Sequence, residues 1–214
     1  MTASLKVKVW GDLALFTRPE AKAERVSYPV ITPSAARGVL EAIFWKPEFK
    51  YHIKKIHVLK PIQYYSILRN EVASIVPSNV MSSKKDFLAD DDRQQRHSIM
   101  LRDVAYIIEA DMELMEHATD NIAKYRDMFR RRVAKGQCFQ RPYFGTRECA
   151  VHFAEPEQSD RAIHWTEELG PMLFDVKFPK DSAKNAQAIP YFFEAKLENG
   201  VLHVPDYLYK EVYS

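Results

Sequence analysis

The segments LRDVAYIIEADMEL, residues 101–114, and NIAKYRDMFRRRVAKG, residues 121–136, are the ones from which the fold is predicted first. The first segment has the composition of a long β-strand. The second repeats apolar residues at helical spacing, has an N-cap in Thr119 or Asp120, and ends at Gly136, where a left-handed C-cap is expected. Together they predict a strand that leads through a short connection into an amphipathic helix.

The N-terminal part of the chain repeats this order of strand and helix. Residues 5–10 alternate apolar and basic side chains, which predicts a half-buried strand, and a loop is expected over residues 11–20. Thr32 is a helix N-cap residue and the proline after it suits the first helical position. The pattern predicts a helix over residues 33–45, stopped by Pro47.

Further strands are predicted on both sides of the insertion in the middle of the chain. Residues 49–62 alternate again, and residues 64–68 extend into a neighbouring strand. Residues 74–97 are mostly polar and are interpreted as an insertion loop. Residues 147–153 predict one more strand. The order strand, helix, strand, strand, helix, strand is that of a ferredoxin-like (RRM-like) α+β fold, with a long insertion before its third strand.

The C-terminal part has a different character. Residues 172–178 and 192–205 predict short antiparallel strands, and the Asn-Gly pair at 199–200 is the strongest hairpin signal in the chain. We therefore expect two domains, a ferredoxin-like domain over residues 1–154 and a small C-terminal antiparallel β subdomain over residues 155–214.

Composition restricts the class of protein. The 214 residues are 46% hydrophobic and 28% charged, with a formal net charge of +2. No run approaches the roughly 18 apolar residues of a membrane span, and lysines interrupt the first residues, where a signal peptide would be apolar. Cys138 and Cys149 lack metal-ligand spacing, and no nucleotide-binding, zinc-protease or serine-hydrolase motif is present. We therefore expect a cytoplasmic protein without a cofactor, a bound metal or a membrane partner.

The second predicted helix separates apolar from basic residues. At about 100° per residue, four apolar side chains form a stripe that we expect to be buried, Ile122, Tyr125, Phe129 and Val133. Lys124, Arg131 and Lys135 share the opposite side and are called the basic ridge below. Residues 122–147 contain eight Lys or Arg and a single acidic residue, Asp127. Since interleaved Glu is missing, we interpret the ridge as a phosphate-binding surface, with a merely solvated face as the alternative.

Aromatic residues next to basic ones could stack on unpaired bases. Trp45, Phe139, Tyr143 and Phe144 have this setting, with core packing of each as the alternative. The loop over residues 136–148 is the best candidate as a unit, because glycines bracket it and arginines project from it.

Several segments resemble the type I-C CRISPR-associated endoribonuclease of the RAMP superfamily. These segments are WGDLALFTRPE (10–20), TPSAARGVLEAIFWKP (32–47), LRNEV (68–72), RQQR (93–96) and AKYRDMFRRRVAKGQCFQRPYFGTREC (123–149). The similarity runs in register over about residues 5–153. It implies a ferredoxin-like domain with a C-terminal β extension and metal-independent cutting of precursor CRISPR RNA at the base of its repeat hairpin. It also implies that the mature product stays bound among the other subunits of the type I-C interference complex.

The resemblance also points to particular site residues. Members that cut RNA have a Tyr near the end of the first helix and a Lys-His pair early in the second, where this chain has Phe44 and Lys124-Tyr125. His117 precedes the second helix and is the first candidate to replace the missing groups. The catalytic candidates are Lys124, Tyr125, His117 and Phe44, with Tyr51 and His52 behind them. The RNA-binding candidates are Arg18, Arg37, Lys46, Arg130, Arg131, Lys135, Arg141 and Arg147.

Three functions remain open at this level. The first is an endoribonuclease that matures CRISPR RNA. The second is a subunit that clamps the RNA 5′ segment in the complex and cuts nothing. The third is a general binder of single-stranded or duplex DNA, which would use the same basic surface without hairpin specificity.

Overall fold

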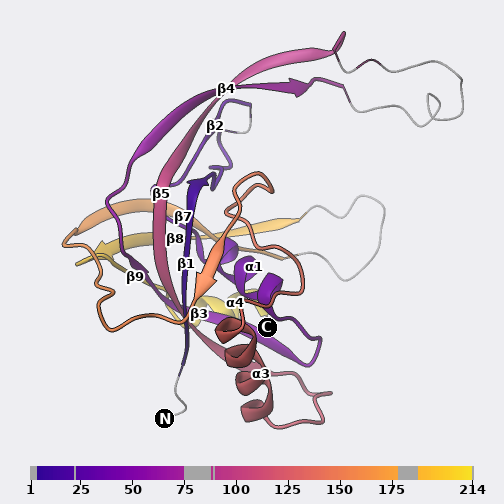
Figure 1. Cartoon of the computed structure of the whole chain (residues 1–214), viewed down its shortest axis with the longest axis vertical. Coiled ribbons are helices and arrows are strands. Elements are labelled where there is room, and N and C mark those ends of the chain that lie inside the picture. The colour runs from indigo at the N-terminus through magenta and orange to yellow at the C-terminus, as the bar shows by residue number, and fades with distance from the viewer. Residues whose placement is uncertain (1–3, 22, 75–87, 89, 178–187, 214) are drawn as a thin grey trace, which may run out of the picture.

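A computed structural model describes residues 4–21, 23–74, 88, 90–177 and 188–213. Its elements, in chain order, are β1 (Leu5–Ala14), β2 (Arg25–Val26), α1 (Pro33–Ile43), β3 (Phe49–Val58), β4 (Tyr64–Val72), β5 (Arg93–Leu114), α3 (Ile122–Ala134), β6 (His152–Ala154), β7 (Glu167–Lys177), β8 (Ile189–Glu198), β9 (Val201–His203) and α4 (Tyr207–Tyr213). The fold is mixed α/β and is built on a mostly antiparallel, curled sheet (Figure 1).

The long strand β5 organises the sheet, whose strand order is β6-β1-β5-β3-β9-β8-β7. Its C-terminal part pairs antiparallel with β1 on one side and with β3 on the other. Its N-terminal part pairs with β4, from Val72 opposite Arg93 to Tyr64 opposite Leu101, and with the short β2. In Figure 1 the β4–β5 hairpin extends away from the body of the molecule, and the three helices lie toward the other end.

Local sequence explains why the two long helices form where they do. The Thr32 hydroxyl accepts a hydrogen bond from the Ala35 backbone N–H at 3.2 Å, and Pro33 occupies the first turn of α1, as predicted. In α3 the Asn121 side chain caps the helix by accepting from the Ala123 N–H at 3.0 Å. The predicted caps Thr119 and Asp120 are therefore wrong by one or two positions.

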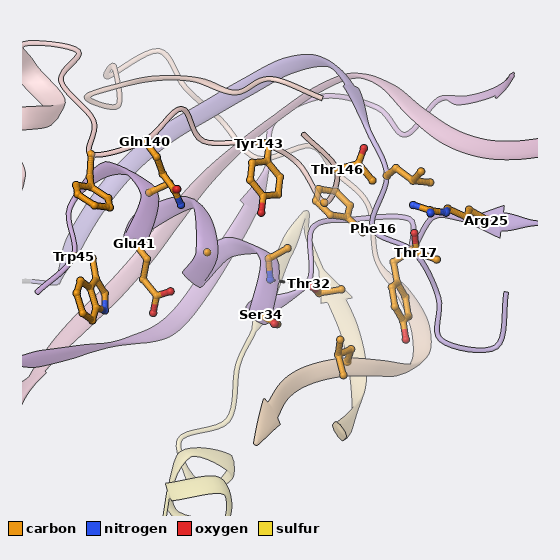
Figure 2. A pocket seen from close by; sticks show the side chains of 18 residues that line it. Phe16, Thr17, Arg25, Thr32, Ser34, Glu41, Trp45, Gln140, Tyr143 and Thr146 are labelled. Atoms are coloured by element: carbon orange, nitrogen blue, oxygen red, sulfur yellow. Dashed lines mark hydrogen bonds between the residues drawn. The ribbon is translucent and has the colours of Figure 1, made fainter. Parts of the chain in front are cut away.

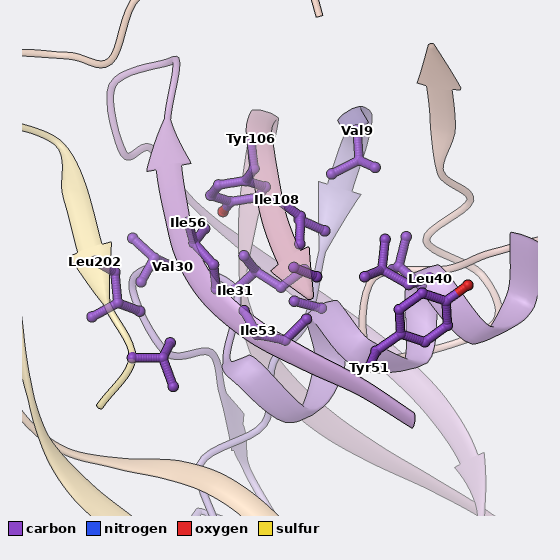
Figure 3. Packing of buried hydrophobic residues seen from close by; sticks show 14 of the residues in the cluster. Val9, Val30, Ile31, Leu40, Tyr51, Ile53, Ile56, Tyr106, Ile108 and Leu202 are labelled. Atoms are coloured by element: carbon purple, nitrogen blue, oxygen red, sulfur yellow. The ribbon is translucent and has the colours of Figure 1, made fainter. Parts of the chain in front are cut away.

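One hydrophobic core joins the sheet to the helices. Figure 3 shows its centre, where side chains of β1, β3 and β5 meet Leu40 of α1 and Leu202 of β9. Helix α1 packs on β3 and β7, and α3 packs on β5 and β6. Because β9 pairs with β3, the strands of the C-terminal part continue the same sheet.

The two predicted helices and most of the predicted strands are confirmed, but several of their ends are wrong. β1 continues to Ala14 through the predicted loop over residues 11–20, because it pairs with β5 along that whole length. β5 begins at Arg93, inside the predicted insertion loop over residues 74–97, because β4 is there to pair with it. Residues 75–87 and 89 of that loop lie outside the described residues.

Near the end of the first domain the predicted strand over residues 147–153 is mostly wrong. Only β6, residues 152–154, is strand, and the residues before it form a turn in which the Cys149 N–H donates to the Thr146 carbonyl at 2.9 Å. The predicted hairpin at Asn199 and Gly200 is confirmed, since both have positive φ, 49° and 77°. The short helix α4 was not predicted.

No helix formed by the described residues is long and apolar enough to cross a membrane.

Candidate functional site

A cavity of about 630 Å³ lies between α1 and the loop over residues 136–148. It is called the α1 groove here. Its walls come from residues 15–17 just after β1, from one face of α1 and from the loop, so segments about a hundred residues apart in sequence form it. Figure 2 shows Ser34, Glu41 and Trp45 along one wall and Gln140 and Tyr143 along the other.

Three of the four aromatic residues singled out in the sequence meet at this groove. Trp45, Phe139 and Tyr143 line it and are 52%, 72% and 38% exposed. Phe144 is fully buried and packs edge-on against Phe16 and Tyr106, so for this residue the core alternative is correct. The faces of exposed aromatic rings gathered around one cavity suit unpaired bases.

The walls of the groove are held together by backbone hydrogen bonds. The N–H groups of Phe139 and Gln140 donate to the Ala42 carbonyl at the end of α1, at 2.9 and 3.0 Å. The Leu15 N–H donates to the Phe144 carbonyl at 3.1 Å. Gly145 has φ +81°, and a Cβ there would lie 1.9 Å from the Leu15 carbonyl oxygen, so only glycine fits. The groove therefore exists before any ligand binds.

The α1 side of the groove is built from small side chains. Thr32, Ser34, Ala35, Gly38 and Ala42 line it. Gly38 is exposed in the middle of the helix, and a Cβ at this position would meet nothing within 4 Å. Packing within the described residues therefore gives no reason for a glycine at position 38, although glycine inside a helix costs roughly 1 kcal/mol of stability relative to alanine. A bare helix surface does allow a ligand to come close to the backbone.

Ionic side chains are few in the groove. Among its lining residues Arg25 is the one cation, 3.5 Å from Glu71, and Glu41 is the one carboxylate. Burial raises the pKa of Glu41, Arg37 lowers it, and Asp175 adds to the increase. The groove therefore favours bases over phosphates.

Arg37 was expected to contact RNA, but it lies in an ion-pair network of the fold. Its guanidinium bonds to the buried Asp175 of β7 and lies 3.5 Å from Glu41 of its own helix. These two carboxylates neutralise the positive charge of Arg37, which a phosphate would otherwise bind. This ion pair could not be predicted from sequence, because Asp175 is 138 residues away.

The two faces of α3 agree with the helical wheel. Tyr125, Phe129 and Val133 are buried and Ile122 is half-buried, whereas the whole basic ridge is exposed. The expectation that the ridge lacks acidic partners is wrong at Lys124, whose Nζ lies 2.7 Å from Asp120 Oδ2. The hydrogen bond and charge of Asp120 raise the pKa of Lys124. Lys135 makes no ion pair within the described ranges.

The other predicted RNA-binding cations have mixed surroundings. Arg141 and Arg147 are exposed on the loop beside the groove and make no ion pair with the described part of the chain. Arg130 is exposed and lies 3.8 Å from Asp127. Arg18 rests over the Tyr28 ring at 5.0 Å and pairs weakly with Glu20, and Lys46 is half-buried. The loop arginines are therefore the best placed of this set.

The catalytic candidates Phe44 and Tyr125 lie inside the protein. Each is 1% exposed, and both rings lie against Phe49, at 5.4 and 5.3 Å between centroids. The Tyr125 hydroxyl is buried without a hydrogen-bond partner among the described residues. Burial raises its pKa, so the hydroxyl is a weaker acid than an exposed tyrosine. In this structure both side chains pack α3 and the end of α1 onto β3.

The remaining candidates differ in their access to solvent. Tyr51 is buried, and its hydroxyl donates to the Phe44 carbonyl at 2.7 Å, with a pKa raised well above the usual value by burial. His52 stacks on Tyr209 at 4.2 Å and lies 2.9 Å from Glu113. His117 is exposed in the turn before α3. Of the imidazole and phenol candidates, His117 is the one best able to reach a bound phosphate.

Three features of the site were missed in the sequence. Arg132 lies inside the predicted basic cluster, yet its guanidinium donates to the Ile43 carbonyl at 3.0 Å and covers the Phe44 ring at 5.1 Å, so it joins the two helices. Glu41 and Gln140 line the groove without any motif to mark them. Gly38 had a signal, a glycine within an otherwise regular helical pattern.

The chain is similar to known CRISPR-associated proteins. The model of a family described as CRISPR-associated protein (Cas_Cas5) matches residues 4–205. The chain is 49% identical to "CRISPR pre-crRNA endoribonuclease Cas5d" of Thermus thermophilus, over 99% of this chain and 95% of the relative. It is 44% identical to the protein of that name from Mannheimia succiniciproducens, over 99% of each. A solved CRISPR-associated protein, 24% identical, has a TM-score of 0.68 over 94% of this chain and 91% of its own, which shows a shared fold.

Proposed function

Because this chain belongs to the Cas5d family of CRISPR-associated proteins, we propose that it binds precursor CRISPR RNA and cuts it at the repeat hairpin without a metal ion. It then retains the mature RNA within the type I-C interference complex, together with the other subunits, in the cytoplasm. The observation behind this proposal is the 49% identity, over almost the full length of both chains, to a precursor CRISPR RNA endoribonuclease.

The finer description of the fold belongs to the same proposal. The strand order β6-β1-β5-β3, with α1 after β1 and α3 after β5, supports a ferredoxin-like core. We keep the division into residues 1–154 and 155–214 as a proposal, in which β9 joins the second part to the edge of the first.

The groove and the ridge suit different parts of one RNA. Unpaired nucleotides beside the hairpin would lie in the α1 groove and stack on Trp45, Phe139 and Tyr143. The exposed cations Lys124, Arg131 and Lys135 would follow the phosphates of the hairpin stem. The arginines of the loop over residues 136–148 are exposed beside groove-lining residues and would contact the RNA backbone next to the single-stranded part.

The proposed reaction uses the RNA as its own nucleophile. The 2′-oxygen forms a bond to the adjacent phosphorus, the bond from phosphorus to the 5′-oxygen of the next nucleotide breaks, and a 2′,3′-cyclic phosphate and a 5′-hydroxyl result. One group must accept the 2′-hydroxyl proton and another must give a proton to the 5′-oxygen. His117 is proposed for one of these transfers, and Lys124, released from Asp120, stabilises the charge on the phosphoryl oxygens.

The test is single-turnover cleavage of repeat RNA in the presence of EDTA. We expect a product that ends in a 2′,3′-cyclic phosphate. A substrate with a 2′-deoxynucleotide on the 5′ side of the cut serves as the control, and it should bind normally and remain intact. Cleavage of the deoxy substrate, or a strict need for Mg²⁺, would contradict this mechanism.

A second function is favoured by the burial of Phe44 and Tyr125. Neither side chain offers an acid or base to a ligand at the surface, so the protein would bind the 5′ segment of CRISPR RNA within the complex and cut nothing. Tight binding of repeat RNA without any product in the same assay would support this function and exclude the first.

A further inference from the structure

The end of the α1 groove nearest the C-terminus of α1 combines an aromatic ring with a carboxylate. Trp45 and Glu41 lie side by side in Figure 2, and Gln140 faces them from the loop. Backbone hydrogen bonds from Gln140 and Phe139 to Ala42 fix the loop against this end of the helix. The backbone of the loop is therefore held against the end of α1, and the three side chains line one corner of the groove.

The negative charge at this corner is unusual for a surface that is proposed to bind RNA. Arg37 lies 3.5 Å from Glu41, but it also bonds to Asp175, whose side chain is 4% exposed. The single positive charge of Arg37 is therefore shared between the carboxylates of Glu41 and Asp175. The Glu41 side chain is 38% exposed and lines the groove, so it can still accept hydrogen bonds from a ligand. A carboxylate in this position repels phosphates and attracts N–H donors.

The chemistry of the four bases distinguishes the ligand. Carboxylate oxygens only accept hydrogen bonds, and two oxygens lie side by side. Guanine is the one RNA base that presents two adjacent donors on its Watson–Crick edge, N1–H and the 2-amino group. Adenine and cytosine present one amino group beside an acceptor nitrogen, and uracil presents one N–H between two carbonyls. Acceptors that face a carboxylate are repelled, so only guanine matches both oxygens.

We propose that this corner is a pocket for one unpaired guanine, which stacks on Trp45 and donates N1–H and the 2-amino group to the Glu41 carboxylate. The proposal rests on the proposed function, since it assumes that the groove holds single-stranded RNA. The Gln140 amide is the group that can donate to guanine O6, an interaction that adenine cannot make with the same atom. Glu41 is then a specificity-determining residue rather than a general RNA contact.

The experiment measures fluorescence anisotropy with labelled U8 RNA and with U8 in which the fourth uridine is replaced by guanosine, inosine or adenosine. Inosine lacks the 2-amino group and keeps N1–H and O6. A bidentate contact contributes about 1–3 kcal/mol, so we expect the guanosine RNA to bind about tenfold more tightly than U8 and adenosine RNA, with inosine RNA between them.

The variant Glu41→Gln tests the role of the carboxylate. We expect it to lose the guanosine preference and to bind U8 as well as the parent does, while the matched variant Glu155→Gln, at an exposed acid outside the groove, keeps the preference. Equal binding of guanosine and inosine RNA by the parent would overturn the proposal without any variant. So would an undiminished preference in Glu41→Gln, or no binding of any U8 RNA. Binding and cleavage of the repeat hairpin are measured separately, so failure of this pocket is distinguishable from failure of the proposed function.

Discussion

The α1 groove and the basic ridge are both exposed, and both are proposed to contact one RNA, but they do so by different physical means. The groove is concave and aromatic, with its walls fixed by backbone hydrogen bonds. The ridge is a convex row of cations on α3, and Lys124 must exchange Asp120 for a phosphate. Stacking responds weakly to salt, whereas phosphate contacts release counterions and respond strongly. Affinity, salt dependence and catalysis can therefore be lost separately in this protein.

The largest expected effect is on catalysis at the ridge end of the site. Lys124→Ala and His117→Ala should each slow single-turnover cleavage by roughly 10²- to 10⁴-fold, because each removes one positioned group. His117→Ala should leave RNA affinity nearly unchanged, whereas Lys124→Ala should also lose the affinity of one phosphate contact. Tyr125→Phe should cleave within about twofold of the parent, since the hydroxyl that it removes is buried. His164→Ala, at an exposed histidine far along the chain, is the control for His117→Ala. A slow Tyr125→Phe with a normal His117→Ala would reverse the two roles.

The next largest effect is on the salt dependence of RNA binding, which distinguishes the ridge from the groove. Replacing Lys124, Arg131 and Lys135 together by Ala should lower the log-log salt slope of hairpin binding by about 0.7 to 0.9 per lost contact, or about 2 to 3 in all. Between 50 and 200 mM salt the parent should therefore lose roughly 20- to 40-fold more affinity than the triple variant. The control replaces three exposed cations of the C-terminal part, Arg161, Lys196 and Lys210. If both variants keep the slope of the parent, the ridge is only a solvated face.

A substitution in the groove should lower RNA affinity without changing the salt dependence of binding. Trp45→Ala should weaken binding of single-stranded RNA by about tenfold, since stacking on an aromatic ring contributes about 1–3 kcal/mol per base, and should leave the salt slope unchanged. Tyr207→Ala removes an equally exposed ring from α4, outside the groove, and is the control. A change in salt slope with Trp45→Ala would mean that the groove holds phosphates rather than bases.

The smallest effect is expected at Gly38. Gly38→Ala should raise the free energy of unfolding by about 0.5–1 kcal/mol, because alanine favours the helix and the new Cβ meets nothing in the structure. Because Gly38 lines the groove, the added methyl group should lower RNA affinity by a small factor. Denaturant unfolding and anisotropy on the same variant check the two opposite changes. A variant that is more stable and binds RNA as before would show that the glycine has no role in binding.

Much of the secondary structure followed from local sequence. The alternation in β1, the Thr-Pro start of α1, the apolar stripe of α3 and the Asn-Gly hairpin all depend on residues within a few positions of each other. The ends of β1 and β5 did not follow, because each end depends on whether a partner strand is present to pair with it. The burial of the candidate residues could not be predicted from local sequence, since it depends on which distant segments pack against them.

The buried face and the basic face of α3 follow from its sequence alone, because the period of a helix and the order of its side chains place them before any other segment is added. Three other features depend on how distant segments pack together. Phe44 and Tyr125 lie against Phe49, Asp175 neutralises Arg37, and Trp45, Glu41 and Gln140 share one corner. Most of these contacts join residues that are far apart in sequence. Contacts between residues about a hundred positions apart depend on how the sheet brings the helices and the loop together, and no local pattern specifies that.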